Sequence, residues 1–147
     1  MMSGLPIHTQ TLTTTNTNYT FTSDGSYQWR VLAQNSNSTS SPVNSTRNIV
    51  IDRTAPQAPI PNSPSANDTA SNPVNLTWTR DASATIDSVY IYADTNLTTL
   101  VSSTRTAEQN MNFNGTIGQD YFWRVKSLDA VGNKSSFSMR RKFIVVP

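Results

Sequence analysis

Hydrophobic and polar residues alternate in short runs throughout the chain. In VNLTWT at 74–79, Val74, Leu76 and Trp78 would lie on one side of an extended strand and the polar residues on the other. Runs of the same kind occur at 87–93, 111–113, 121–125 and 136–146. Asn, Ser, Asp, Gly and Pro separate the runs, and no stretch keeps the period of a helix. The pattern predicts many short antiparallel strands.

The side of the strand on which each residue falls predicts the hydrophobic core. In the last run, Phe137 and Met139 have the same parity as Phe143 and should face the same way. The residues expected to face inward are Val74, Leu76, Trp78, Val89, Ile91, Phe113, Tyr121, Trp123, Val125 and Phe143. Each such residue contributes roughly 1.5–3 kcal/mol when fully buried, which is enough for one small domain.

The chain contains an internal repeat with an offset of 94 residues. YQWRV at 27–31 recurs as YFWRV at 121–125, and the same offset aligns Arg47 with Arg141 and Val43 with Phe137. Between 19 and 51, seven of 33 positions are identical to their counterparts, more than a shared Ser/Thr bias would give. Because the offset matches the length of an immunoglobulin-like sandwich, it predicts two tandem modules.

A proline-rich segment separates the two copies. Residues 52–64, DRTAPQAPIPNSP, hold four prolines and no good strand pattern. They predict a semi-rigid linker that leads into the first edge strand. Residues 56–147 are then expected to form a complete module. Residues 1–55 match only the second half of the repeat, so the counterpart of the 74–79 strand would lie before residue 1.

The motifs VNLTWT, YFWRV and DAVGNKSS together resemble a fibronectin type III module, and the DRTAPQAP junction resembles joints between tandem modules of bacterial surface proteins. The resemblance implies an all-β, antiparallel β-sandwich with one complete module preceded by the C-terminal half of another. It implies that Trp78 fills the core, to which Trp123 also belongs by its parity. It also implies that Tyr121 and Tyr27 form tyrosine corners, in which the hydroxyl bonds back to the preceding backbone. In the half module, Trp29 should be left half exposed because no second sheet covers it.

Composition excludes several classes of protein. The chain has no Cys, so it has no disulfide scaffold and no thiolate metal site. No apolar run approaches 18 residues, so no membrane span is expected. The net charge of +2 is too small an excess to indicate nucleic-acid binding. Only 14% of residues are charged, whereas Ser, Thr and Asn are abundant.

Candidates for catalysis or metal binding are weak. The single histidine, His8, has no partner of metal-binding type and is interpreted as a surface residue. Most of the nine carboxylates, Asp87 among them, stand beside residues that form turns and are interpreted as turn formers. Calcium bound by Asp52 and Asp129 at the joint between modules is an alternative, although calcium wants six or more oxygen ligands. No phosphate-binding, dinucleotide-binding or hydrolase motif occurs, so no enzyme, cofactor or metal is expected.

One surface stands out from the Ser/Thr/Asn coat. If the core residues face inward, the opposite face of the same sheet carries three aromatic residues and four cations: Tyr90, Tyr92, Phe122, Arg124, Lys126, Arg140 and Lys142. The first copy of the repeat has Gln28, Thr46 and Asn48 at three of these positions, so the fold does not demand the patch. It could bind a sugar ring, an anionic polymer or a neighbouring protein. Alternatively, it provides only cross-strand stacking.

The sequence therefore predicts a non-catalytic structural or adhesive spacer of a multi-repeat extracellular or cell-surface protein. An accessory module of a secreted polysaccharide-degrading enzyme is the first alternative. A carbohydrate- or protein-binding module that uses the aromatic and basic face is the second. The expected partners are neighbouring modules, a surface glycan or protein, and a second copy that contacts the incomplete module.

Overall fold

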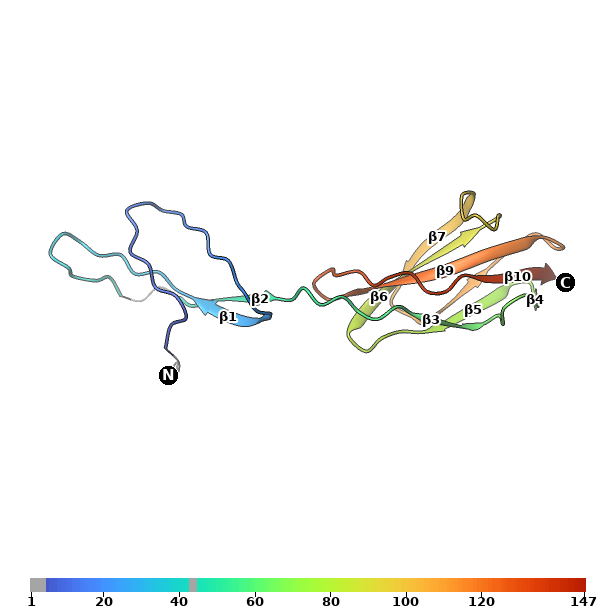
Figure 1. The fold of residues 1–147 in the computed structure, drawn as a ribbon, viewed down its shortest axis with the longest axis horizontal. Helices are drawn as coiled ribbons and strands as arrows, with labels where there is room; N and C mark the ends of the chain where they lie inside the picture. Colours follow the sequence, from blue (N-terminus) through green and yellow to red (C-terminus); the bar gives the residue numbers. More distant parts are fainter. Residues whose placement is uncertain (1–4, 43–44) are drawn as a thin grey trace. The chain divides into compact units, whose positions relative to one another are not determined.

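The computed structural model describes residues 5–42 and 45–147, and within these residues it contains strands and turns but no helix (Figure 1). The chain divides into two compact units, Met1–Ile51 (unit 1) and Asp52–Pro147 (unit 2). The predicted all-β class is confirmed.

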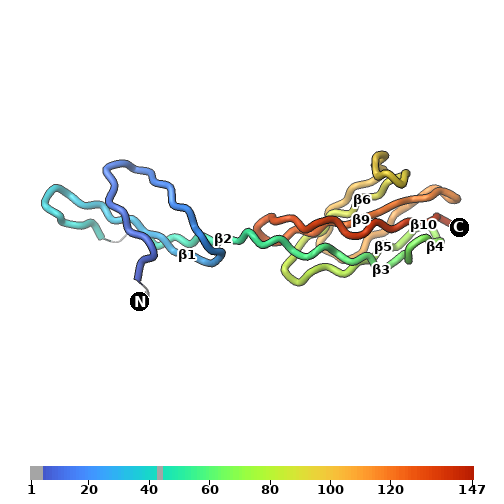
Figure 2. Tube along the Cα trace, in the orientation of Figure 1, coloured from blue at the N-terminus to red at the C-terminus, as the bar shows by residue number. Residues whose placement is uncertain are grey.

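Unit 2 is a sandwich of two sheets, which stack face to face in Figures 1 and 2. The first sheet has the order β3-β5-β8, with β3 at Ile60–Ser63, β5 at Val74–Thr79 and β8 at Asn110–Phe113. The second has the order β4-β10-β9-β6-β7, with β4 at Asp68–Ser71, β6 at Ala84–Tyr92, β7 at Leu100–Thr106, β9 at Asp120–Asp129 and β10 at Arg141–Val146. Neighbouring strands are antiparallel except for β4 and β10, which are parallel.

The core of unit 2 lies between the sheets, as the alternation predicts. Burial along β9 alternates residue by residue, because every second side chain points away from the opposing sheet. Trp78 of β5 meets Trp123 of β9 edge to face, with ring centroids 6.4 Å apart. The buried cluster comprises Val74, Leu76, Trp78, Val89, Ile91, Phe113, Tyr121, Trp123, Val125, Phe143 and Val145.

The proline-rich segment differs from the predicted linker. Residues 60–63 form strand β3, and Pro59 and Pro61 are buried. Pro61 is tolerated because β3 is an edge strand that pairs only with β5, so its missing N–H removes no bond to a second neighbour. Four residues of the expected linker are therefore part of the sandwich.

The prediction that Phe137 and Met139 face the same way as Phe143 is wrong, and a β-bulge is the reason. Ser138 N donates to Val125 O at 2.8 Å, whereas Arg141 pairs with Trp123, so the segment that leads into β10 advances three residues while β9 advances two. A bulge of this kind reverses the direction in which neighbouring side chains point. Phe137 accordingly packs against Tyr90 on the outer face, and Met139 is 84% exposed.

In the described part of unit 1, β1 (Gly25–Trp29) and β2 (Arg47–Ile51) form an antiparallel pair. Its register pairs Trp29 with Arg47 and Tyr27 with Ile49. The counterparts at an offset of 94, Trp123 with Arg141 and Tyr121 with Phe143, are paired in the same way between β9 and β10. The repeat in the sequence is thus a repeat of strand register.

The turn that follows each tryptophan-containing strand is repeated as well. Ser41 N donates to Ala33 O at 2.8 Å, as Ser135 N does to Ser127 O. Ala33 N donates to Ser41 Oγ at 3.1 Å, as Ser127 N does to Ser135 Oγ at 2.9 Å. The isolated bridge between Gln34 and Ser40 corresponds to the one between Leu128 and Lys134.

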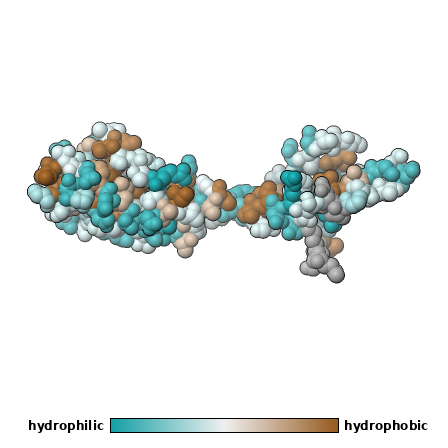
Figure 3. Space-filling view, turned by 180° about the vertical axis from the view of Figure 1, so that it is seen from behind, coloured by the Kyte–Doolittle hydropathy of each residue, from teal (hydrophilic) through white to brown (hydrophobic). Residues whose placement is uncertain are grey.

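The sheet face that carries Trp29 in unit 1 and the equivalent face that carries Trp123 in unit 2 differ in how they are covered. Trp29 is 49% exposed, whereas Trp123 is fully buried under the β3-β5-β8 sheet. Figure 3 shows hydrophobic atoms gathered in unit 1, at the right of that view. A row of rings from His8 through Tyr19 and Phe21 to Tyr27 has centroids 4.5–4.8 Å apart. The predicted counterpart of Phe137, Val43, lies outside the described residues.

Candidate binding face and buried polar cluster

The seven residues of the predicted patch come together on the outer face of the five-stranded sheet. Tyr90 lies opposite Arg124, and Tyr92 lies opposite Phe122, which in turn lies opposite Lys142 on β10. Lys126 lies opposite Ser88, and Arg140 immediately precedes β10. Along β6 and β9, the residues of the patch alternate with core residues.

Most of these side chains are engaged with one another or with neighbouring loops. The Arg124 guanidinium carbon lies 3.7 Å from the Phe137 ring centroid, and its Nη2 donates to Tyr92 Oη at 3.2 Å. Arg140 donates to the carbonyl oxygen of Thr95. Lys142 Nζ lies 2.7 Å from Asp120 Oδ2. These contacts favour cross-strand stacking for this part of the face.

Tyr92 is a correction to the predicted patch, because only 7% of it is exposed. The β6–β7 register shifts at Ile91 and Tyr92, and Arg124 packs over the Tyr92 ring at 5.4 Å. A ligand would therefore find little of Tyr92 on the surface.

A hollow of about 230 Å³ opens beside the stacked residues on the same face. Of its lining residues, only Tyr90 and Lys126 belong to the predicted patch. Arg105 and Lys134 are not predictable from alternation, because β7 alternates weakly and Lys134 lies in a turn motif. The lining residues are Ser88, Tyr90, Arg105, Lys126, Leu128, Lys134 and Phe137.

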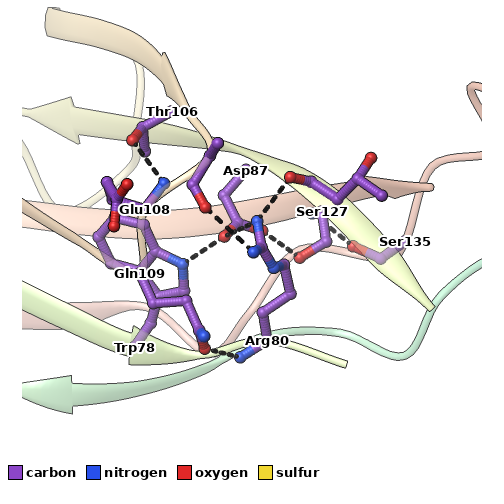
Figure 4. Close-up of polar contacts among 10 residues, drawn as sticks. Trp78, Arg80, Asp87, Thr106, Glu108, Gln109, Ser127 and Ser135 are labelled. Carbon is purple, nitrogen blue, oxygen red and sulfur yellow. Dashed lines mark hydrogen bonds and ion pairs between the residues drawn. The ribbon is translucent and has the colours of Figure 1, made fainter. Parts of the chain in front are cut away.

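A buried polar cluster lies at one end of the core, around Asp87 of β6 (Figure 4). Trp78 Nε1 donates to Asp87 Oδ2 at 2.6 Å, and Ser127 Oγ donates to Asp87 Oδ1 at 2.5 Å. Arg80 Nη1 lies 3.4 Å from Oδ2 and balances the charge. Arg80 also donates to the carbonyl oxygens of Thr85 and Ala107.

The interpretation of Asp87 as a turn former was wrong, because Asp87 is fully buried within a strand. A fully buried carboxylate is stable only when it is paired and hydrogen-bonded. Both of its oxygens are occupied, so the cluster joins β5, β6 and β9 rather than offering a free acid for catalysis.

Three other aspartates do act in turns. Thr99 N donates to Asp94 Oδ2 at 2.5 Å, and this bond, together with those from Thr98, lowers the pKa of Asp94 to about 2. The Ser83 hydroxyl and backbone N–H lower the pKa of Asp81. Burial raises the pKa of Asp129, but bonds from Asn133, Val131 and Gly132 outweigh it, so its pKa is lowered.

The proposed calcium ligands are engaged by N–H donors. Asp129 Oδ1 accepts from three backbone amides, and Oδ2 accepts from Asn133 Nδ2 at 2.8 Å. Asp52 Oδ1 accepts from Thr54 N at 2.9 Å. Within the residues that the structure describes, no three His, Cys, Asp or Glu side chains gather to hold a metal ion.

Both predicted corner tyrosines bond backward to the backbone. Tyr121 Oη accepts from Thr116 N at 3.0 Å, and Tyr27 Oη donates to Ser23 O at 2.8 Å. A three-stranded sheet packed on a sheet that includes β10-β9-β6-β7, together with such a corner, is the architecture of a fibronectin type III-like module. Unit 2 has this fold.

Comparison with solved structures finds modules of the same kind. Fibronectin(III)-like modules of Clostridium thermocellum CbhA are similar at 16% identity and a TM-score of 0.44, over 60% of this chain and 95% of that chain. An Fn3-like protein from the same organism is similar at 18% identity and a TM-score of 0.49, over 64% and 97%. The FN1-FN3 domains of chicken CNTN1 are similar at 14% identity and a TM-score of 0.46, over 82% and 44%. No family model and no curated protein matches the chain.

Proposed function

We propose that unit 2 is a non-catalytic spacer module of a multi-module extracellular or cell-surface protein. The observation that carries the proposal is the route of the chain, which enters the sandwich at Asp52 and leaves at Pro147 at the opposite end (Figure 1). Modules of this kind can be joined end to end and hold other domains apart. The surface rich in uncharged Ser, Thr and Asn supports an extracellular setting. No described segment forms a helix that could span a bilayer.

The terminal strands are arranged to resist tension between these ends. β10 pairs in parallel with β4 from Phe143↔Asp68 to Val146↔Ser71, and Asn67 N and Asn72 N donate to Lys142 O and Val146 O beside this ladder. A force that pulls the ends of unit 2 apart moves β10 along its own axis. The bonds of the ladder must then break together rather than one after another.

Single-molecule pulling tests the proposal. The chain has no native cysteine, so handles can be attached at introduced cysteines. Handles at Asp52 and Pro147 load β10 in shear. Handles at Thr116 and Pro147 provide the control, because Gly118 N donates to Val145 O at 2.8 Å, which places both sites at one end of the sandwich. We expect a clearly higher unfolding force for the first pair. Equal forces, or unfolding of the first pair at the lower force, would contradict a spacer that resists tension along its length.

A further inference from the structure

The hollow on the outer face of unit 2 combines three cations with no carboxylate in its lining. Arg105, Lys126 and Lys134 surround it, and none of them takes part in the ion pairs found among residues 5–42 and 45–147. Of the other cations of this face, Arg124 lies against Phe137, Arg140 donates to Thr95 and Lys142 pairs with Asp120. We propose that this hollow, the cation hollow, binds the carboxylate or sulfate groups of an anionic polysaccharide.

The strand register explains how the cations come to surround one point. Ser88 of β6 lies opposite Arg105 of β7 and opposite Lys126 of β9. Ser88, Arg105 and Lys126 therefore form one row across the sheet, on its outer face. The backbones of the two cations are then about 10 Å apart, two strand spacings, with a short serine between them. Like charges in one row repel each other. An anion seated over Ser88 would contact both and remove this repulsion.

The third cation is placed by a rigid turn. Lys134 forms an isolated antiparallel bridge with Leu128, next to the turn in which Asp129 Oδ1 accepts three backbone N–H groups. Lys126 Nζ lies 4.7 Å from the centroid of Phe137, which forms one wall. The backbone of Lys134 and the side chain of Lys126 are therefore positioned before a ligand arrives, which lowers the entropy cost of binding.

The fold does not require these cations. At the positions offset by 94 residues, unit 1 has Leu32 for Lys126 and Ser40 for Lys134, although the backbone bridge at Ser40 is the same. The charges are therefore a property of this module rather than of its architecture.

The geometry favours a polysaccharide over a nucleic acid. Single-stranded nucleic acids bind through bases stacked on exposed aromatic rings. Here Phe137 and Tyr90 are half-buried, and Arg124 and Lys126 lie against the Phe137 ring. Duplex DNA calls for a line of cations that follows closely spaced phosphates. One hollow with three cations instead fits the more widely spaced acid groups of a uronate or sulfated chain.

Binding of defined polymers to the full chain tests the proposal. Dextran sulfate and polygalacturonate supply sulfate and carboxylate groups, and uncharged dextran supplies neither. We expect calorimetry at low salt to show binding of at least one anionic polymer and none of dextran. Arg105→Gln with Lys134→Gln should weaken that binding by at least about tenfold, because charge-assisted hydrogen bonds are each worth about that factor or more.

The matched control is Arg140→Gln with Lys142→Gln, which removes one Arg and one Lys from the same sheet face outside the hollow. It should change affinity by less than about twofold, with circular dichroism confirming that both variants are folded. Equal weakening by the two variants would overturn the proposal, since it would show attraction by net charge alone. Absence of binding to both anionic polymers, or tighter binding of an oligothymidylate with the same dependence on Arg105 and Lys134, would also overturn it.

Discussion

At the scale of single residues, the two core tryptophans of unit 2 differ in the pairing of their indole nitrogens. Trp78 Nε1 bonds to Asp87, whereas Trp123 Nε1 is buried without a partner. Trp78→Phe removes a hydrogen-bond donor from the buried Asp87 carboxylate, whereas Trp123→Phe removes a buried donor that has no acceptor. We expect urea unfolding to show a loss of free energy at least about 1 kcal/mol larger for Trp78→Phe. Equal losses would mean that the bond to Asp87 adds nothing.

Asp94 should carry part of the pH dependence of stability. Its pKa in the folded protein is about 2, against 3.8 for the free group. Because the folded-state value is the lower one, the carboxylate stabilises unit 2 above about pH 4, and this contribution is lost as the pH falls toward about 2. The Asp94→Asn variant should show a flatter fall of unfolding free energy over this interval. An NMR titration midpoint near 3.8 for the Asp94 carboxyl would contradict the assignment.

At the scale of elements, the hydroxyls of Ser135 and Ser138 hold the segment before β10 against β9. Ser138 Oγ accepts from Val125 N at 2.9 Å, in a buried position. Ser138→Ala leaves that amide unpaired and should lower the free energy of unfolding by about 1–3 kcal/mol in urea titrations. Ser136→Ala, at an exposed position of the same segment, is the control and should stay within about 0.5 kcal/mol of the parent. A similar loss in both variants would show that the Ser138 hydroxyl has no special role.

Alternation was sufficient to predict the strands that face the core. Trp78 in β5 and Trp123 in β9 lie where parity places them, because each run stays in one register. Parity failed at Phe137, since a bulge is a property of backbone pairing that leaves no mark in the pattern. The turn interpretation failed at Asp87, which has the parity of Val89 and Ile91, because the partners that make a buried aspartate acceptable come from two other strands.

The candidate site was predicted only in part for a related reason. Tyr90 and Lys126 were found because they alternate with core residues on adjacent strands. Arg105 and Lys134 reach the same hollow through the β6–β7 pairing and the turn after β9. Those neighbours are known only once strand order and register are known.

At the scale of the whole molecule, the exposed sheet face around Trp29 in unit 1 corresponds to the covered sheet face around Trp123 in unit 2. The Trp123 face of unit 2 lies under a second sheet, but Trp29 lies half exposed. We propose that a second copy of the chain covers the Trp29 face by a two-fold contact. Sedimentation equilibrium should show a concentration-dependent dimer of the full chain. Trp29→Ser should weaken it by about 30-fold or more, as expected for a central aromatic contact.

Val50→Ser supplies the control for this experiment. Val50 is exposed on the opposite side of β2 from Ile49, which pairs with Tyr27 on the Trp29 face. It should leave the dimer unchanged. A chain that stays monomeric at all concentrations, or that responds equally to both substitutions, would contradict the contact.

If unit 2 is a complete module, residues 52–147 fold without any contribution from unit 1. The most direct measurement is urea unfolding of residues 52–147 alone beside the full chain. The predicted result is one cooperative transition with a free energy of unfolding within about 0.5 kcal/mol of that of unit 2 in the full chain. Loss of the cooperative transition, or a large drop in its free energy, would contradict the account.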